Sequence, residues 1–405
     1  MTAFRISHLW ARLPLWLETL GEWRAARAAW MAWGVFALVV CVIVAVQPDR
    51  RTVTPEYRKA SEKWWASEPG VYPKRNGFLY LPQAAIFYTP FRVLPKRVGE
   101  PLWRLVMIGS LAGALWWAAK SLDKKNWGVI FLLATMLVLP SCLASARNGQ
   151  VNMPLAAFYL LAALCVSSGR WWAAAACFAV SLGLKPISLA PMLLAGAAFP
   201  RLRLPMAAFT GLLLLLPFAH PDPTYVAAQY QDFVRCFLQA GRPSGHTWCD
   251  LAGMLRTFGL QPGDDFMWAV RIAAALATLA ISLRIARHAD RLRAALGVTL
   301  AGAIYLMLFN PRTETNSYVI LAALTALAGA MEILRHASAR RAAAYVLLAI
   351  VWGSENYGWP IFPLTNLWLK ALCTLALAAW LAPALWTGRD PGPFSGTAAS
   401  TTRMA

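Results

Sequence analysis

The chain has 405 residues, of which 59% are hydrophobic and only 14% are charged. Soluble domains carry about 25% charged residues, so this composition excludes an ordinary soluble fold. The net charge of +20 would suit a nucleic-acid partner. The basic residues, however, stand in short groups between apolar runs, which excludes nucleic acid and is typical of membrane proteins. We therefore expect an all-α integral membrane protein.

Apolar runs of near-membrane length recur along the chain, and a helix needs about 20 apolar residues to cross a bilayer. The runs that qualify or come close are 28–47, 102–119, 127–145, 151–167, 205–219, 267–283, 294–309, 317–334, 342–354 and 363–386. We expect the run 171–199 to add two short spans that turn at Leu184-Lys185-Pro186. The prediction is a polytopic bundle of about 10–12 transmembrane helices.

The basic groups between these runs predict the orientation of the bundle. Arg24 and Arg27 precede the first apolar run, and no cleavage site follows, so we expect a cytoplasmic amino-terminus. Two long segments, 48–101 and 220–265, then fall on the outer side, and their aromatic residues favour helices lying at the interface. Residues 1–387 form one predicted membrane domain, followed by a tail that we expect to be disordered and cytoplasmic, 388–405.

A first polar turn separates two apolar runs on the predicted outer side. Gly149 suits a tight turn in which neighbouring amides cap helix ends. The alternative is that the polar side chains line a cavity, because polar groups at this depth are costly without partners. The side chains concerned are Arg147, Asn148, Gln150 and Asn152. Both interpretations remain open.

Two further polar features fall on the same side. Lys185 either snorkels to the headgroups or lines a cavity, and the helix break at Pro186 favours the cavity. In the turn 310–318, Arg312 and Glu314 either pair with each other or act separately. In the second case Arg312 binds an anion and Glu314 orients it or accepts a proton. Asn316 belongs to the same polar turn.

The remaining acidic candidates lie in the two long outer segments. They are Asp49 and Glu56 in the first and Asp250 in the second. Most such carboxylates are solvated surface charges. Cys236 and Cys249 share the second segment, where a disulfide is an open alternative if the segment is periplasmic. The His and Cys spacings match no metal site, so neither a metal nor a cofactor is expected.

Several segments resemble glycosyltransferase family 87, the bacterial polyprenyl-phosphate-mannose-dependent α-mannosyltransferases. The first is Gly77-Phe78-Leu79-Tyr80-Leu81-Pro82, followed by Thr89-Pro90-Phe91 and Leu94-Pro95. The turn 147–152, Gly169-Arg170 and Leu184-Lys185-Pro186 resemble the middle of the family. Weaker similarity is found in Asp250-Leu251-Ala252-Gly253-Met254-Leu255 and Asn310-Pro311-Arg312.

The resemblance implies a C-type glycosyltransferase in the bacterial inner membrane, with periplasmic-side interfacial helices. Such an enzyme moves a hexose, here mannose, from a polyprenyl-phosphate-sugar donor to a lipid or glycan acceptor at the outer face, among membrane lipids. Arg147, Lys185 and Arg312 would stabilise the phosphate. The polar side chains that would position the sugar or these cations are Asn148, Gln150, Asn152, Asp250, Glu314 and Asn316.

The sequence departs from the family at one position. The family places an acid four residues before a tyrosine in the first outer loop, and Val53 stands there before Tyr57. Asp49 or Glu56 is the nearest substitute for a general base, and Glu314 is a further candidate. Two alternatives therefore remain, a transporter or lipid-sugar flippase and a catalytically silent family member.

Overall fold

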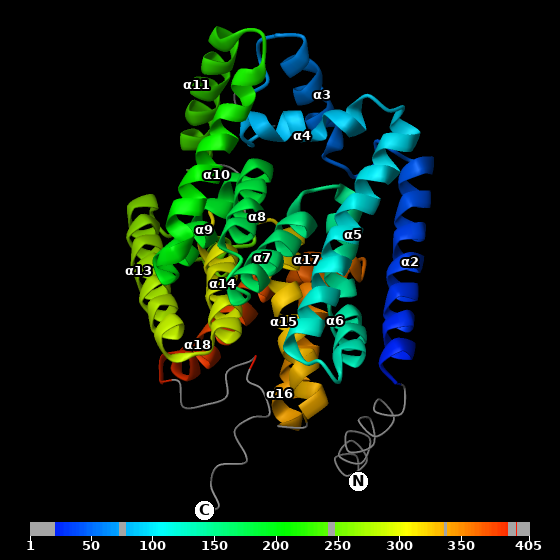
Figure 1. Cartoon of the computed structure of the whole chain (residues 1–405), viewed down its shortest axis with the longest axis vertical. Helices are drawn as coiled ribbons and strands as arrows, with labels where there is room; N and C mark the ends of the chain where they lie inside the picture. Colours follow the sequence, from blue (N-terminus) through cyan, green and yellow to red (C-terminus); the bar gives the residue numbers. More distant parts are fainter. Residues whose placement is uncertain (1–20, 73–77, 242–247, 336–337, 388–393, 395–405) are drawn as a thin grey trace, which may run out of the picture.

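The computed structural model describes residues 21–72, 78–241, 248–335, 338–387 and 394. In these ranges every regular element is helical, and no strand occurs (Figure 1). One apolar core runs from α2 (Glu22–Val46) to α18 (Leu369–Thr387). The structure therefore confirms the predicted all-α bundle. The predicted tail lies outside the described residues, apart from Phe394, and its disorder stays a prediction.

Seven helical segments within the described ranges are long and apolar enough to cross a membrane. They are α2, α5 (Lys96–Leu122), α6 (Trp127–Asn148), α10 (Arg203–Leu215) with its flanking turns, α13 (Asp264–His288), α14 (Arg291–Phe309) and α15 (Val319–Arg335) with its leading turn. The central helix is α15, whose spanning window is 89% buried, whereas that of α13 is 11% buried. A peripheral α13 presents most of its apolar side chains to lipid.

Other apolar helices are shorter than a full span. They are α7 (Asn152–Ser167), α8 (Trp171–Leu184), α9 (Leu189–Ala198) with its leading turn, and α18 from Leu369 to Ala384. The helix α16 (Ala339–Trp352) is likewise short. The run 363–386 begins inside α17 (Ile361–Thr365) and continues as α18. The 14 residues of α8 extend about 21 Å, less than the hydrocarbon thickness of about 30 Å.

The connection between α8 and α9 lies at the predicted helix break. Lys185 has extended backbone, and Pro186 begins the short 3-10 turn η1 (Pro186–Ser188). Proline has no N–H and disfavours helical geometry in the residue before it, which explains why α8 ends at Leu184. Because α8 is short, this connection lies within the depth of the bundle. A polar group there needs partners from neighbouring helices.

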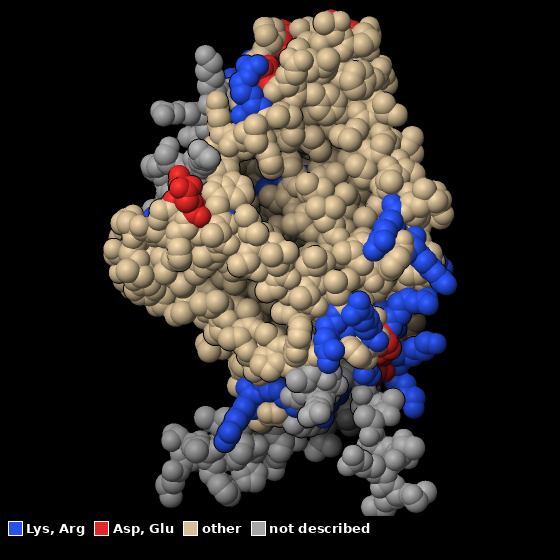
Figure 2. All heavy atoms as spheres, turned by 90° about the vertical axis from the view of Figure 1, so that its left-hand side faces the viewer, with Lys and Arg blue, Asp and Glu red and all other residues tan. Residues whose placement is uncertain are grey.

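Most of the two long segments predicted to be outer lies at one end of the bundle (Figure 1). They contain α3 (Thr54–Trp65), α4 (Pro82–Arg92), α11 (Pro223–Ala240) and α12 (Leu251–Thr257). Figure 1 shows α3, α4 and α11 at the top and the start of α2 at the bottom. Lys and Arg side chains gather at the bottom (Figure 2), where α13 ends and α14 begins with exposed Arg284, Arg287 and Arg291. On the face seen in Figure 2, basic side chains are therefore denser at the end opposite α3, α4 and α11.

Candidate active site

The first polar turn follows α6 and has the geometry of a helix C-cap. Gly149 adopts a left-handed φ of 77°, which glycine tolerates without steric cost. A Cβ on Gly149 would stand 2.7 Å from Arg104 Cζ and 2.7 Å from Thr54 Cγ2. Its carbonyl accepts a hydrogen bond of 2.8 Å from Trp103 Nε1. Gly149 therefore makes the tight turn as expected, but the expected amide caps are wrong, because within the described ranges neither the end of α6 nor the start of α7 (Asn152–Ser167) is capped by an amide side chain.

A buried arginine of α5 binds the same turn. Arg104 is fully buried, and its Nε donates to the Ala146 carbonyl (3.1 Å) and its Nη2 to the Arg147 carbonyl (3.2 Å). Glu100 balances its charge at 2.6 Å. Sequence reasoning overlooked this pair. The spacing of four residues between opposite charges at the edge of an apolar run is the signal that would have found it.

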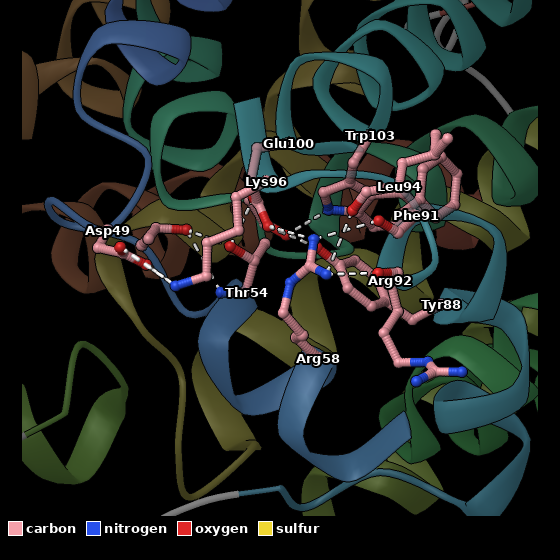
Figure 3. Close-up of polar contacts among 12 residues, drawn as sticks. Asp49, Thr54, Arg58, Tyr88, Phe91, Arg92, Leu94, Lys96, Glu100 and Trp103 are labelled. Carbon is pink, nitrogen blue, oxygen red and sulfur yellow. Dashed lines mark hydrogen bonds and ion pairs between the residues drawn. The ribbon is translucent and has the colours of Figure 1, made fainter. Parts of the chain in front are cut away.

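The Glu100 carboxylate is saturated with partners from two outer helices. It accepts hydrogen bonds from Thr54 Oγ1 (2.7 Å) and Tyr88 Oη (2.9 Å), and Arg58 Nη2 lies 3.9 Å away. Figure 3 shows these side chains converging on Glu100, with Arg58 also turned to the carbonyls that end α4. This cluster fastens α3 and α4 to α5. A carboxylate so occupied is structural.

The turn 310–318, the second polar turn, contributes to a polar network beside the first polar turn. Asn152 Nδ2 donates to Gln150 Oε1 (2.8 Å) and Asn316 Oδ1 (3.1 Å). Gln150 Nε2 donates to Glu314 Oε2 at 2.5 Å, and Lys185 Nζ donates to Asn152 Oδ1 at 3.1 Å. Five predicted site residues from the first turn, the start of α7, the α8–α9 connection and the second turn therefore meet in one place.

The members of this network differ in their spare hydrogen-bonding capacity. Both ends of the Gln150 and Asn152 amides are engaged, and both side chains are buried. Lys185 and Glu314 are only half-buried. Within the described ranges each makes one hydrogen bond in the network, although an ammonium has three donors and a carboxylate two acceptor oxygens. Lys185 and Glu314 are thus the members able to bind another group.

A small aromatic cavity of about 20 Å³ adjoins the network, and a cavity of this size holds about one water molecule. Its lining consists of Tyr57, Tyr80, Ala84, Phe87, Tyr88, Trp103, Val151 and Leu184. Val151 separates Gln150 from Asn152, and Leu184 precedes Lys185. Figure 2, which views the side of α10, α11 and α13, shows a hollow with basic atoms at its floor.

Two hydroxyl groups in the cavity stand near the carboxylate of the network. Tyr57 Oη donates to Tyr80 Oη at 2.8 Å. Burial raises the pKa of both phenols, and the Glu314 carboxylate raises them further. Both tyrosines therefore stay protonated at neutral pH, and because Tyr57 donates its O–H to Tyr80, the O–H of Tyr80 is the one left to donate to another group.

The other two predicted cations face elsewhere. Arg312 Nε donates to the Ala240 carbonyl at 3.1 Å, and its guanidinium lies 5.6 Å from the Trp248 ring centre. Arg50 and Arg51 are the charges that act on the Arg147 guanidinium. The structure therefore brings Lys185, but not Arg147 or Arg312, to the amides of the network.

The first turn also uses its backbone at Asn148. Its carbonyl accepts hydrogen bonds from Val53 N (3.0 Å) and Thr52 Oγ1 (2.9 Å). These contacts place the start of α3 beside the end of α6. Val53, which stands where the family carries an acid, is thus held next to the turn by its backbone.

The candidate acids of the outer segments lie apart from the network. Asp49 forms an exposed ion pair with Lys96 at 3.0 Å, and Glu56 is exposed on α3. Asp250 accepts a hydrogen bond from Gly253 N at 2.8 Å and caps α12, and burial raises its pKa. Cys249 is a buried free thiol, so it is not bridged to Cys236.

Comparison with known proteins identifies the family of this chain. The sequence model of glycosyltransferase family 87 matches residues 78–311. The match includes the first polar turn, Lys185 and most of the aromatic cavity, and it ends just before Arg312. No curated protein sequence shows significant similarity to the chain. Because the matched segment covers more than half of the 405 residues, the chain belongs to glycosyltransferase family 87 and is a multi-pass membrane glycosyltransferase.

Proposed function

We propose that the protein transfers a hexose, with mannose as first choice, from a polyprenyl-phosphate donor to a hydroxyl of a lipid or glycan acceptor. The observation that carries the proposal is the network in which Lys185 and Glu314 are joined through Gln150 and Asn152 beside the aromatic cavity. It supplies a cation and a carboxylate at fixed positions. A displacement at a sugar phosphate requires both.

Lys185 is the proposed partner of the donor phosphate. When the bond between the anomeric carbon and the phosphate oxygen breaks, its electron pair leaves with the phosphate, and negative charge grows there. A half-buried ammonium with donors to spare stabilises that charge better than a fully hydrated one. The shortness of α8 supports this role, because Lys185 at its end would be within reach of a lipid-borne phosphate in the outer leaflet.

Glu314 is the proposed general base. The acceptor oxygen attacks the anomeric carbon from the side opposite the phosphate, and its proton passes to Glu314, so the configuration inverts. One Glu314 oxygen is fixed by Gln150, which orients the other. Asp49 is a weaker candidate because its carboxylate accepts a hydrogen bond of 3.0 Å from Lys96 Nζ. Glu56 is a weaker candidate because it is exposed on α3.

The aromatic lining of the cavity is the proposed contact surface for the sugar ring, which would have to part these side chains because the cavity itself holds about one water molecule. Tyr80, Tyr88 and Trp103 offer apolar ring surface for the C–H faces of a hexose, and the Tyr57–Tyr80 pair offers hydroxyl groups for its hydroxyls. We place this site at the outer, periplasmic face of the bacterial inner membrane. The basic loops gather at the opposite end of the bundle, where the positive-inside rule puts the cytoplasm.

Purified protein in proteoliposomes, supplied with radiolabelled polyprenyl-phospho-mannose and a membrane-lipid acceptor extract, tests this function. We expect labelled product from the wild type and a drop of about 100-fold for Lys185→Met, because an electrostatic donor to the leaving group is lost. Lys96→Met, which removes an exposed lysine at the same end, is the matched control and should transfer at the wild-type rate.

Two other results would contradict the proposal. Donor that crosses the bilayer without forming product would identify a flippase. Donor that binds without product or crossing would identify a silent family member. Equal transfer by Lys185→Met and the wild type would overturn the phosphate assignment.

A further inference from the structure

A second buried ion pair lies under the second polar turn. Lys370, at the start of α18, is fully buried, and it is paired with Glu355, whose side chain is 4% exposed. Lysine is almost never fully buried without a partner. Replacing such a pair by apolar residues is often neutral or stabilising, so the pair is weak evidence for a role in stability alone.

The contacts of the Lys370 ammonium explain its position. Besides Glu355, it donates to the Thr315 carbonyl (3.0 Å) and the Trp352 carbonyl (2.8 Å). These contacts use all three of its donors. Thr315 lies between Glu314 and Asn316. One lysine from α18 therefore fixes the backbone between two members of the polar network.

The same turn has a second anchor in the outer segment. Cys249 N donates to the Thr313 carbonyl at 2.8 Å, and Tyr318 Oη donates to the Cys249 carbonyl at 3.0 Å. The Lys370 ammonium lies 5.4 Å from the Tyr318 ring centre. The turn is thus held on both sides of Glu314, at Thr313 by the backbone of Cys249 and at Thr315 by Lys370 of α18.

We propose that Lys370, charge-balanced by Glu355, is a positioning residue that orients Glu314 and Asn316 through the Thr315 carbonyl. The inference rests on the proposed function, because it assumes that Glu314 accepts the acceptor proton. Lys370 itself touches no reacting atom. Its loss leaves the Lys185–Asn152 contact in place, so donor binding is retained while the carboxylate loses its alignment.

The test compares wild type with the double variant Lys370→Met/Glu355→Gln in the proteoliposome assay. Both charges are removed together because a single substitution would strand a buried charge and unfold the protein. We expect kcat to fall about 10- to 100-fold, the cost of a small misalignment, with the donor KM unchanged and a lower thermal unfolding midpoint, because the Thr315 and Trp352 carbonyls lose their donor. Ser354→Ala removes a buried hydroxyl that has no hydrogen-bond partner within the described ranges, and it should behave as wild type.

The outcomes separate the positioning role from the function on which it rests. If wild type forms no product, the proposed function falls and the positioning role falls with it. If wild type forms product and the folded double variant has the same kcat, only the positioning role is overturned. If the double variant does not fold, Lys370→Arg replaces it, because a planar guanidinium keeps the charge but displaces the Thr315 carbonyl. An unchanged kcat in that variant would also overturn the role.

Discussion

Two acid–base pairs at the same end of the bundle differ in how they are joined. Glu100 and Arg104 are in direct contact at 2.6 Å, and both are surrounded by further partners. Glu314 and Lys185 are linked only through Gln150 and Asn152, and both are half-buried beside the aromatic cavity. In the Glu100–Arg104 pair, both charges are engaged in contacts that hold helices together. The second pair keeps its charges apart and leaves them able to act on a ligand.

The largest effect on stability is expected from breaking the direct pair. Arg104→Met would remove the closest cation from the buried Glu100 carboxylate, leaving Arg58 at 3.9 Å, and would free the carbonyls that end α6. We expect the free energy of unfolding to fall by about 3–5 kcal/mol. Thermal unfolding in detergent measures this loss. A melting curve equal to that of wild type would show that the Glu100–Arg104 pair is not a structural anchor.

A smaller effect on stability, with a large effect on transfer, is expected from removing the amide that links the second pair. Asn152→Leu has similar volume but strands Gln150 Oε1 and the Lys185 ammonium. We expect a loss of about 1–3 kcal/mol and a transfer rate about 10- to 100-fold lower. Melting curves and the proteoliposome assay give the two values. Wild-type transfer would mean that Lys185 and Glu314 do not depend on their connection.

The smallest effect is expected at Asp250, whose carboxyl caps α12. Burial raises its pKa. At pH values between the ordinary and the raised pKa, the folded state therefore binds more protons than the unfolded state. The Asp250 carboxyl therefore contributes to stability at low pH, and this contribution is lost as the pH rises through the raised pKa. Asp250→Asn keeps the cap without that loss. Its melting point should match or exceed that of wild type at pH 7, with unchanged transfer, and a large drop in transfer would place Asp250 in the site instead.

The sequence predicts those features that depend on local residues. Apolar runs locate the long helices, Gly149 identifies the tight turn, and Pro186 identifies the break between α8 and α9. The sequence predicts about 10–12 spans. In the described ranges the structure has seven full-length spanning segments and four shorter apolar helices, namely α7, α8, α9 and α18. Hydropathy detects apolar runs, but it does not distinguish half-length helices from full spans.

Contacts between distant segments could not be predicted in this way. Gln150 and Glu314 are 164 residues apart, and Lys370 reaches Thr315 from another helix. Three cations on one predicted face suggested one phosphate site, yet the local backbone directs Arg312 to the end of α11. Lys370 was overlooked because it stands in an apolar run, where one charge changes the mean hydropathy very little.

The central claim is that Glu314 acts in the chemical step while Lys185 holds the donor. Single-turnover transfer from prebound, labelled donor tests it most directly, with Glu314→Gln compared with wild type and Gln150 left in place to bind the new amide. We expect Glu314→Gln to bind donor as wild type does and to form product at least about 100-fold more slowly, as for the loss of a general base. Product formation at the wild-type rate would contradict the claim and would return the search for the base to Asp49 and Glu56.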